Sequence, residues 1–206
     1  MNLLGALAGP LASEGVNYAP AIVSAAEKHG LDPTLLAAVA AQETGGPGAN
    51  GGRNEVGDGG HGRGLFQIDD RWHDFAKTAA AMDPSRNADY AAGMLSDLLE
   101  RYDGNVREAL SAYNAGDPHA AGTSTIWGDG EKLDYADSVL RHYQQLDGND
   151  ETPDRLGNFA SQLPTQQTLA QPQLPLPAPH AHHHHHRPPS RQAMSYDTYI
   201  NGGENP

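Results

Sequence analysis

The sequence predicts a mainly α-helical domain that contains a glycine-rich loop and a short β segment. Two observations lead to this prediction. Apolar residues recur at helical spacing in five stretches of the first 150 residues, and helix start or stop residues stand at their ends. Ten glycines fall within residues 44–64, and the run that follows, residues 65–68, has the composition of a β-strand.

The first two predicted helices lie before the glycine-rich loop. Residues 18–29 place apolar side chains on one face, and Gly30 is a good residue to end that helix. Asp32 caps the next helix and Pro33 takes its first position, where proline is favoured. This second helix is expected to run through Glu43.

Three further helices are predicted after the loop. Asp83 and Pro84 open the third, which is expected to end near Gly104. The fourth covers residues 105–114, starting with a capping-box pattern, and the fifth covers residues 135–146.

Composition divides the chain into three parts. We expect residues 1–16 to be a frayed lead-in, residues 17–150 to form the domain, and residues 151–206 to be a disordered tail rich in Pro, Gln and His. The tail holds nine of the fifteen prolines and lacks apolar periodicity. Its run of five histidines, residues 182–186, could bind metal in a flexible segment, but low complexity or an appended purification-type sequence is the simpler interpretation.

Charge and residue usage exclude several kinds of partner. The chain has no Cys, so disulfides and cysteine metal sites are excluded. A net charge of −13 argues against nucleic acid, because phosphate contacts need clustered Lys and Arg. The first basic residue is Lys28, so the n-region of a secretory signal is missing, and no transmembrane segment is expected. We expect a monomer.

Glu43 is the first candidate for a catalytic carboxylate. It shares a helical stripe with Leu36 and Ala40, so the apolar face of the helix would turn it inward. A glutamate in apolar surroundings can stay protonated near neutral pH and act as a general acid. The alternative is a glutamate that turns into solvent at the helix end.

Three aspartates flank the glycine-rich loop downstream of Glu43. Inverting cleavage of a glycosidic bond needs a protonated carboxyl group and an ionised partner that orients water. Asp58, Asp69 and Asp70 could supply that partner, although aspartates among loop glycines also serve simple turns. Metalloprotease, phosphate-loop, calcium-loop and nucleophile-elbow patterns are absent from the sequence, and no metal or cofactor is expected.

Four sequence blocks resemble goose-type lysozymes and the related lytic transglycosylases in order and spacing. The resemblance spans roughly residues 22–146. The blocks are Glu43-Thr44-Gly45, Gly62-Arg63-Gly64-Leu65-Phe66-Gln67-Ile68-Asp69, Ala112-Tyr113-Asn114-Ala115-Gly116 and Tyr135-Ala136-Asp137-Ser138-Val139-Leu140. It implies an α+β lysozyme-like fold. Animal goose-type enzymes often carry disulfides and a signal peptide, so this chain is more similar to bacterial or phage members.

The resemblance also implies roles for particular residues. It makes Glu43 the catalytic acid and makes Asp58 and Asp69 the residues that position the attacking water. The positions that would line the cleft, contact sugar or support the acid are Gln67, His73, Tyr113, Asn114 and Tyr135. Trp72 and Trp127 are possible sugar-stacking residues, but both are left out of the predicted site because partly buried tryptophans are commoner.

The implied activity is that of a muramidase, a bacteriolytic and antimicrobial enzyme that acts on bacterial peptidoglycan. It would hydrolyse the β-1,4 bond between N-acetylmuramic acid and N-acetylglucosamine at the cell wall, after secretion, in the periplasm or from a virion. One alternative is a lytic transglycosylase, which forms 1,6-anhydromuramoyl ends without water. Another is a non-catalytic glycan-binding or virion structural module that keeps the fold.

Overall fold

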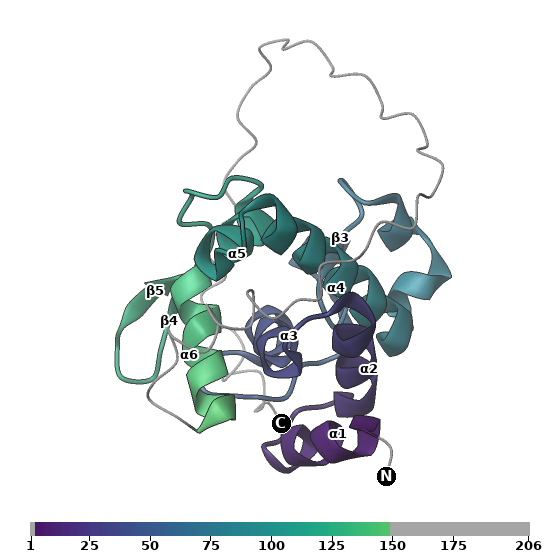
Figure 1. Ribbon diagram of the computed structural model, residues 1–206. Helices are drawn as coiled ribbons and strands as arrows, with labels where there is room; N and C mark the ends of the chain where they lie inside the picture. The colour runs from purple at the N-terminus through teal and green to yellow at the C-terminus, as the bar shows by residue number, and fades with distance from the viewer. Residues whose placement is uncertain (1–2, 149–206) are drawn as a thin grey trace, which may run out of the picture.

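Six α-helices form the body of the domain in the computed structural model, which describes residues 3–148 (Figure 1). Side chains are described from Ala8 onward. The helices are α1 Leu3–Ser13, α2 Ala19–His29, α3 Pro33–Ala40, α4 Pro84–Arg101, α5 Val106–Ala115 and α6 Tyr135–Asp147. With the short strands described below, this is the mainly helical, α+β lysozyme-like fold that the sequence predicts.

Helix α3 lies in the middle of the molecule, with α2, α5 and α6 around it (Figure 1). Every residue from Leu35 to Ala40 is buried, so α3 has no solvent face. A helix that is apolar all round belongs in a core. The predicted amphipathic stripe through Leu36 and Ala40 is therefore too narrow a description of this helix, and the orientation of Glu43 needs another explanation.

The predicted start and stop signals operate as expected at most helix ends. Asp32 Oδ1 accepts a hydrogen bond from the backbone N–H of Thr34 at 2.7 Å, and the Asn105 side chain accepts one from the N–H of Glu108. Gly30 and Gly116 end α2 and α5 in the left-handed conformation, with φ of 67° and 73°. Local capping chemistry thus predicted these boundaries correctly.

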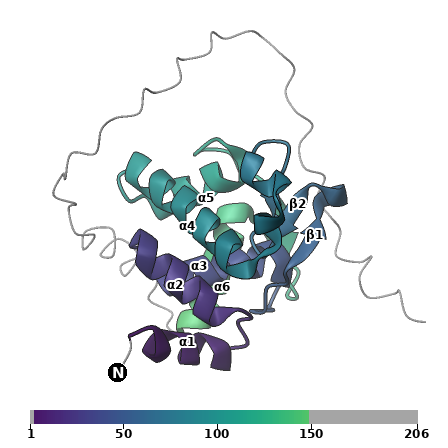
Figure 2. The same ribbon diagram turned by 90° about the vertical axis from the view of Figure 1, so that its right-hand side faces the viewer.

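The glycine-rich loop contains structure that the sequence analysis did not predict. Strands β1 Glu55–Gly57, β2 Gly62–Gly64 and β3 Ile68–Asp69 form an antiparallel three-stranded sheet in sequence order. Gly57 pairs with Gly62, and Gly62 also pairs with Asp69. In Figure 2 the β1–β2 hairpin lies at one edge of the molecule, beside the helices.

The predicted β segment at residues 65–68 is mostly a turn. Only Ile68 belongs to a strand, whereas Leu65 and Phe66 are buried and Gln67 has a left-handed φ of 47°. The backbone N–H of Phe66 donates to the buried side chain of Asn87 at 2.8 Å instead of to a neighbouring strand. Apolar burial in a turn therefore produced the strand-like composition.

Gly64 closes this turn in a position that only glycine fits. Its φ is 74°, and a Cβ atom there would lie 2.5 Å from the Ala81 carbonyl oxygen and from the amide of Asn87. A side chain would be strained by the backbone conformation and would also collide with buried groups.

A second hairpin leads directly into α6. Strands β4 Ser124–Ile126 and β5 Lys132–Asp134 pair antiparallel, and Tyr135 begins α6 at the next residue. This hairpin has no alternation of apolar residues long enough to predict it from sequence.

The N-terminal residues are helical, contrary to expectation. Residues expected to be a frayed lead-in form α1, which packs against α2 and buries Ala8 and Leu11, so that expectation was wrong. The predicted tail and its histidine run lie outside the described residues. Within residues 3–148, the structure has no helix with the length and apolar character that crossing a membrane requires.

Candidate active site

Glu43 lies in a π-helical turn, Ala41–Gly45, that continues directly from α3. The backbone N–H of Gly46 donates to the carbonyl of Ala41 at 3.0 Å, which is the i to i+5 bond of such a turn. The wider turn shifts the register of the last residues relative to α3. π-Helical turns within α-helices are frequent at functional sites. This change of register, rather than a stripe on α3, sets the direction of Glu43.

The residue before Glu43 is fixed by a buried hydrogen-bond network. Ser138 of α6 donates to Oε1 of Gln42 at 2.5 Å, and Nε2 of Gln42 donates to Thr125 of β4 at 2.8 Å. The indole N–H of Trp127 donates to Ser138 at 3.0 Å. All four side chains are buried, so the network is costly to disrupt.

The residue after Glu43 links the π-helical turn to the sheet. The hydroxyl of Thr44 donates to the carbonyl of Leu65 at 3.0 Å and accepts from the backbone N–H of Arg53 at 2.8 Å. Glu43 is therefore held between two fixed neighbours. The same bonds tie its turn to the segment that carries Gln67 and Asp69.

Glu43 is half-buried, and its carboxyl group has a specific partner. The hydroxyl of Tyr135, at the start of α6, donates to Oε1 of Glu43 at 2.7 Å. Tyr135 is only 1% exposed, and its ring stacks with that of Tyr113 from α5 at a centroid distance of 6.5 Å. Three predicted site residues from separate elements thus meet at one place. Asn114, beside Tyr113, accepts a hydrogen bond from the N–H of Thr123 at 2.8 Å.

Asp58 and Asp69 are also brought together, through a residue that the sequence analysis missed. The guanidinium of Arg71 forms ion pairs with both carboxylates. Asp69 is buried and Asp58 is half-buried at the start of a single 3₁₀ turn, Asp58–Gly60. The two carboxylates raise the pKa of the Arg71 guanidinium, chiefly through its hydrogen bond with Asp69. An arginine two residues after Asp69 was the only available signal.

Gln67 braces the hairpin from its left-handed turn. Its side-chain amide donates to the carbonyls of Glu55 and Gly64 at 3.1 and 2.9 Å. A Cβ atom on Gly57 or Gly62 would lie about 2 Å from Oε1 of Gln67, so these two glycines make room for the side chain. The absence of side chains there explains part of the local glycine enrichment.

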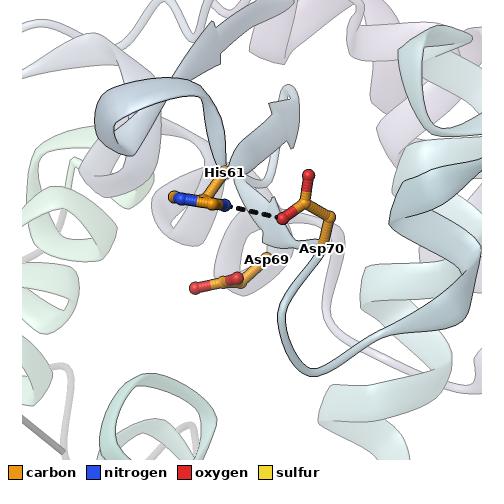
Figure 3. Close-up of side chains that lie close together, drawn as sticks. All are labelled: His61, Asp69 and Asp70. Atoms are coloured by element: carbon orange, nitrogen blue, oxygen red, sulfur yellow. Dashed lines mark hydrogen bonds and ion pairs between the residues drawn. The ribbon is translucent and has the colours of Figure 1, made fainter.

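His61 lies close to two aspartates at the sheet edge (Figure 3). Nδ1 of His61 donates to Asp70 at 2.8 Å, while the Asp69 side chain points in another direction. Candidate ligand atoms of His61, Asp69 and Asp70 lie within 4.8 Å of one another, a spacing that a metal ion could bridge.

The charges around that cluster favour ion pairs over a cation. Arg63 donates to Asp70 at 2.9 Å, and Arg71 pairs with Asp69. The pKa of the Asp70 carboxyl lies below its usual value, first because of the His61 hydrogen bond and also because of the Arg63 charge. A metal ion would have to displace two arginines, so the cluster is better described as a salt-bridge network.

His73 is placed beside the sheet but has a structural partner. Its Nδ1 and the hydroxyl of Tyr90 on α4 share a hydrogen bond of 3.1 Å. Burial lowers the pKa of the His73 imidazole below its usual value, which favours the neutral ring. A neutral imidazole with one nitrogen engaged can still offer the other to a sugar hydroxyl.

The two tryptophans have opposite environments. Trp127 is 3% exposed and belongs to the network behind Gln42, whereas Trp72 is 71% exposed and directly follows Arg71. The expectation of partial burial was therefore wrong for Trp72.

A known protein family matches the part of the chain that contains most of this site. Residues 20–130 match the family model described as the Transglycosylase SLT domain, which is more than half of the 206-residue chain. The matched range includes Glu43, Asp58, Asp69 and Arg71, and it ends shortly before Tyr135.

Proposed function

The chain belongs to the transglycosylase SLT domain family of peptidoglycan-cleaving enzymes, and on that premise we propose that Glu43 is its general acid. The bond to be cleaved is the β-1,4 linkage between N-acetylmuramic acid and N-acetylglucosamine. We further propose that Asp58 and Asp69 orient the attacking water, which makes the enzyme an inverting muramidase.

The hydrogen bond from Tyr135 to Glu43 is the observation that carries the acid assignment. At 2.7 Å it fixes one oxygen of the carboxyl group. The donor is a neutral hydroxyl on a buried ring, so it positions Glu43 without adding a charge. A general acid needs this kind of placement, because proton transfer depends on hydrogen-bond reach to the leaving oxygen.

The reaction then balances in one displacement. The Glu43 carboxyl gives its proton to the glycosidic oxygen as the bond between that oxygen and the anomeric carbon breaks. A water molecule bonds to the opposite face of the anomeric carbon, and its proton passes to an aspartate carboxylate. Glu43 ends as a carboxylate, the aspartate ends protonated, and solvent exchanges the proton back.

Transglycosylation is the second candidate, and the family description favours it. The muramoyl C6 hydroxyl would replace water and form a 1,6-anhydro end, with Glu43 in the same role. The presence of Asp58 and Asp69 in one ion-paired unit favours water as the nucleophile. Transglycosylation uses no water and therefore needs no second carboxylate to orient one.

The remaining predicted contacts extend the proposal along the glycan. We assign Tyr113 and Tyr135 to the support of Glu43, and Gln67, His73 and Asn114 to the lining of the cleft. Residues 17–150 would form the catalytic domain, because α6 supplies Tyr135 and lies beyond the matched range. Helix α1 would belong to the same domain, because it packs against α2 and buries Leu11, and residues 151–206 would lie outside it.

Glu43→Gln tests the proposal most simply. It keeps the size of the side chain and removes the acidic proton, so clearing of a peptidoglycan suspension should slow at least about 100-fold. Glu100→Gln is the matched control, because Glu100 is exposed on α4 and should tolerate the change at full activity. Equal activity of wild type and Glu43→Gln would contradict the acid assignment. Absence of clearing by the wild type would favour the non-catalytic module.

A further inference from the structure

Arg71 saturates Asp69 with hydrogen bonds. Oδ1 of Asp69 accepts from the backbone N–H of Arg71 at 2.8 Å and from its Nε at 2.9 Å. Oδ2 accepts from Nε at 3.0 Å and from Nη2 at 2.5 Å. A carboxylate has about four lone-pair positions, so these contacts occupy its accepting capacity. The side chain is also 8% exposed, which leaves little surface for water.

Asp58 has a different arrangement around the same guanidinium. Only its Oδ2 accepts from Nη2 of Arg71, and Oδ1 has no hydrogen-bond partner among residues 3–148. The Asp58 side chain is 33% exposed, four times the exposure of Asp69. Within this pair of carboxylates, the oxygen available to water is therefore on Asp58.

The backbone at Asp58 indicates that its position is held and not incidental. Its φ is 48°, in the left-handed region, and Gly59 follows with a φ of 63°. Aspartate adopts this region more readily than most non-glycine residues. The ion pair with Arg71 aims the carboxylate from this position.

We infer that Arg71 is a positioning residue that joins the two aspartates, with Asp69 as its anchor and Asp58 Oδ1 as the base that activates water. This inference rests on the proposed hydrolysis. The water oxygen bonds to the anomeric carbon, the water proton goes to Asp58 Oδ1, and Glu43 protonates the departing oxygen. Asp69 takes no proton and acts through Arg71.

Azide separates the two aspartates experimentally. Azide is a nucleophile that needs no base, so it can replace water when the activating carboxylate is removed. Asp58→Ala should lose about 100-fold in hydrolysis, and sodium azide should restore cleavage with a glycosyl azide visible by mass spectrometry. Asp69→Ala should lose activity without rescue, because the Asp58 carboxylate remains and its negative charge keeps the azide anion from the position of the water. Rescue of Asp69→Ala, or of neither variant, would overturn the assignment.

Arg71 itself has a readout that a purely structural role would not change. Arg71→Gln removes the group that aims Asp58 at the water, so kcat should fall about tenfold while KM stays near the wild-type value. Arg71→Lys keeps a donor for both aspartates and should recover part of that kcat. Equal kcat values for all three proteins, or a rise in KM with kcat unchanged, would contradict the positioning role. Thermal unfolding of each variant, and Asp58→Asn beside Asp58→Ala, guard against misfolding.

Wild-type products keep this inference separate from the proposed function. A wild-type digest with hydrolysed reducing ends and unrescued variants would overturn the role of Asp58 alone. A wild-type digest that contains only anhydro ends would overturn hydrolysis and the inference together.

Discussion

The two sides of the candidate site are built from different interactions. Glu43 is positioned by neutral hydrogen bonds among buried groups, through Gln42, Thr44 and Tyr135. Asp58 and Asp69 are positioned by an arginine at the surface of a glycine-rich sheet. The hydroxyl of Tyr135 brings no charge to Glu43, whereas Arg71 brings a cation to both aspartates. The difference suits the proposed roles of a proton donor on one side and a base on the other.

The side of the site that carries Asp58 and Asp69 depends on the conformations of its glycines. Of the substitutions considered, Gly64→Ala should lower the unfolding free energy most. The substitution forces a left-handed alanine and a clash with the Ala81 carbonyl, so unfolding free energy should fall by about 3 kcal/mol. Gly116→Ala is the matched control, since its φ is 73° and no atom lies within 4 Å of an added Cβ. That variant should lose only about 1–2 kcal/mol.

Urea denaturation of both variants checks this comparison. Equal losses would mean that backbone conformation alone matters and that the packing of Gly64 against Ala81 and Asn87 contributes nothing.

The helical side contains a weak point at acidic pH. His142 of α6 is fully buried, and its ring lies tilted against that of Trp127 with a centroid distance of 4.7 Å. Neither of its ring nitrogens is hydrogen-bonded within residues 3–148. Burial lowers the pKa of its imidazole to about 4, from an ordinary 6.5, with a further contribution from Arg141. Between pH 4 and pH 6.5 the unfolded chain binds the His142 proton more readily than the folded chain does. The unfolding free energy therefore suffers no loss from His142 above pH 6.5 and falls as the pH is lowered toward 4.

His142→Leu should remove that dependence. The unfolding free energy of His142→Leu minus that of wild type should be about 2–3 kcal/mol larger at pH 4.5 than at pH 7. His119→Gln is the control, because it removes a histidine that is exposed. Parallel stability curves for wild type and His142→Leu between pH 7 and pH 4.5 would refute the role of His142.

The smallest effect should come from loss of the Tyr135 hydroxyl, which donates to the proposed acid Glu43. Tyr135→Phe removes one hydrogen bond to Glu43, so activity should fall about tenfold and stability by about 1 kcal/mol. Tyr143→Phe makes the same change on the same helix, but its hydroxyl donates to the capping residue Asp32 at 2.8 Å. It should lose similar stability and keep full activity. A similar loss of activity in both variants would assign Tyr135 to folding alone.

Sequence reasoning succeeded where structure depends on local signals. Helix boundaries followed from caps at Asp32, Asn105 and Gly116, and the sequence blocks predicted the family to which the chain belongs. It failed where a long-range contact decides. Arg71 can pair with both aspartates only because the sheet brings Asp58 beside Asp69. The turn at Gln67 depends on Asn87, whose side chain accepts a hydrogen bond from the backbone N–H of Phe66.

The helix that carries Glu43 illustrates the same limit in a different way. Helical periodicity predicted an inward-facing Glu43, but every residue from Leu35 to Ala40 is buried and the π-helical turn changes the register. No pattern of apolar spacing predicts one extra residue in a turn.

Product analysis tests the central claim most directly. Purified peptidoglycan is digested to completion, and the muramoyl ends are identified by mass spectrometry for wild type and Glu43→Gln. The account predicts reducing ends that contain one added water from the wild type, and almost no product from the variant. Anhydro ends, each lighter by one water, would contradict hydrolysis by the Asp58–Arg71–Asp69 unit.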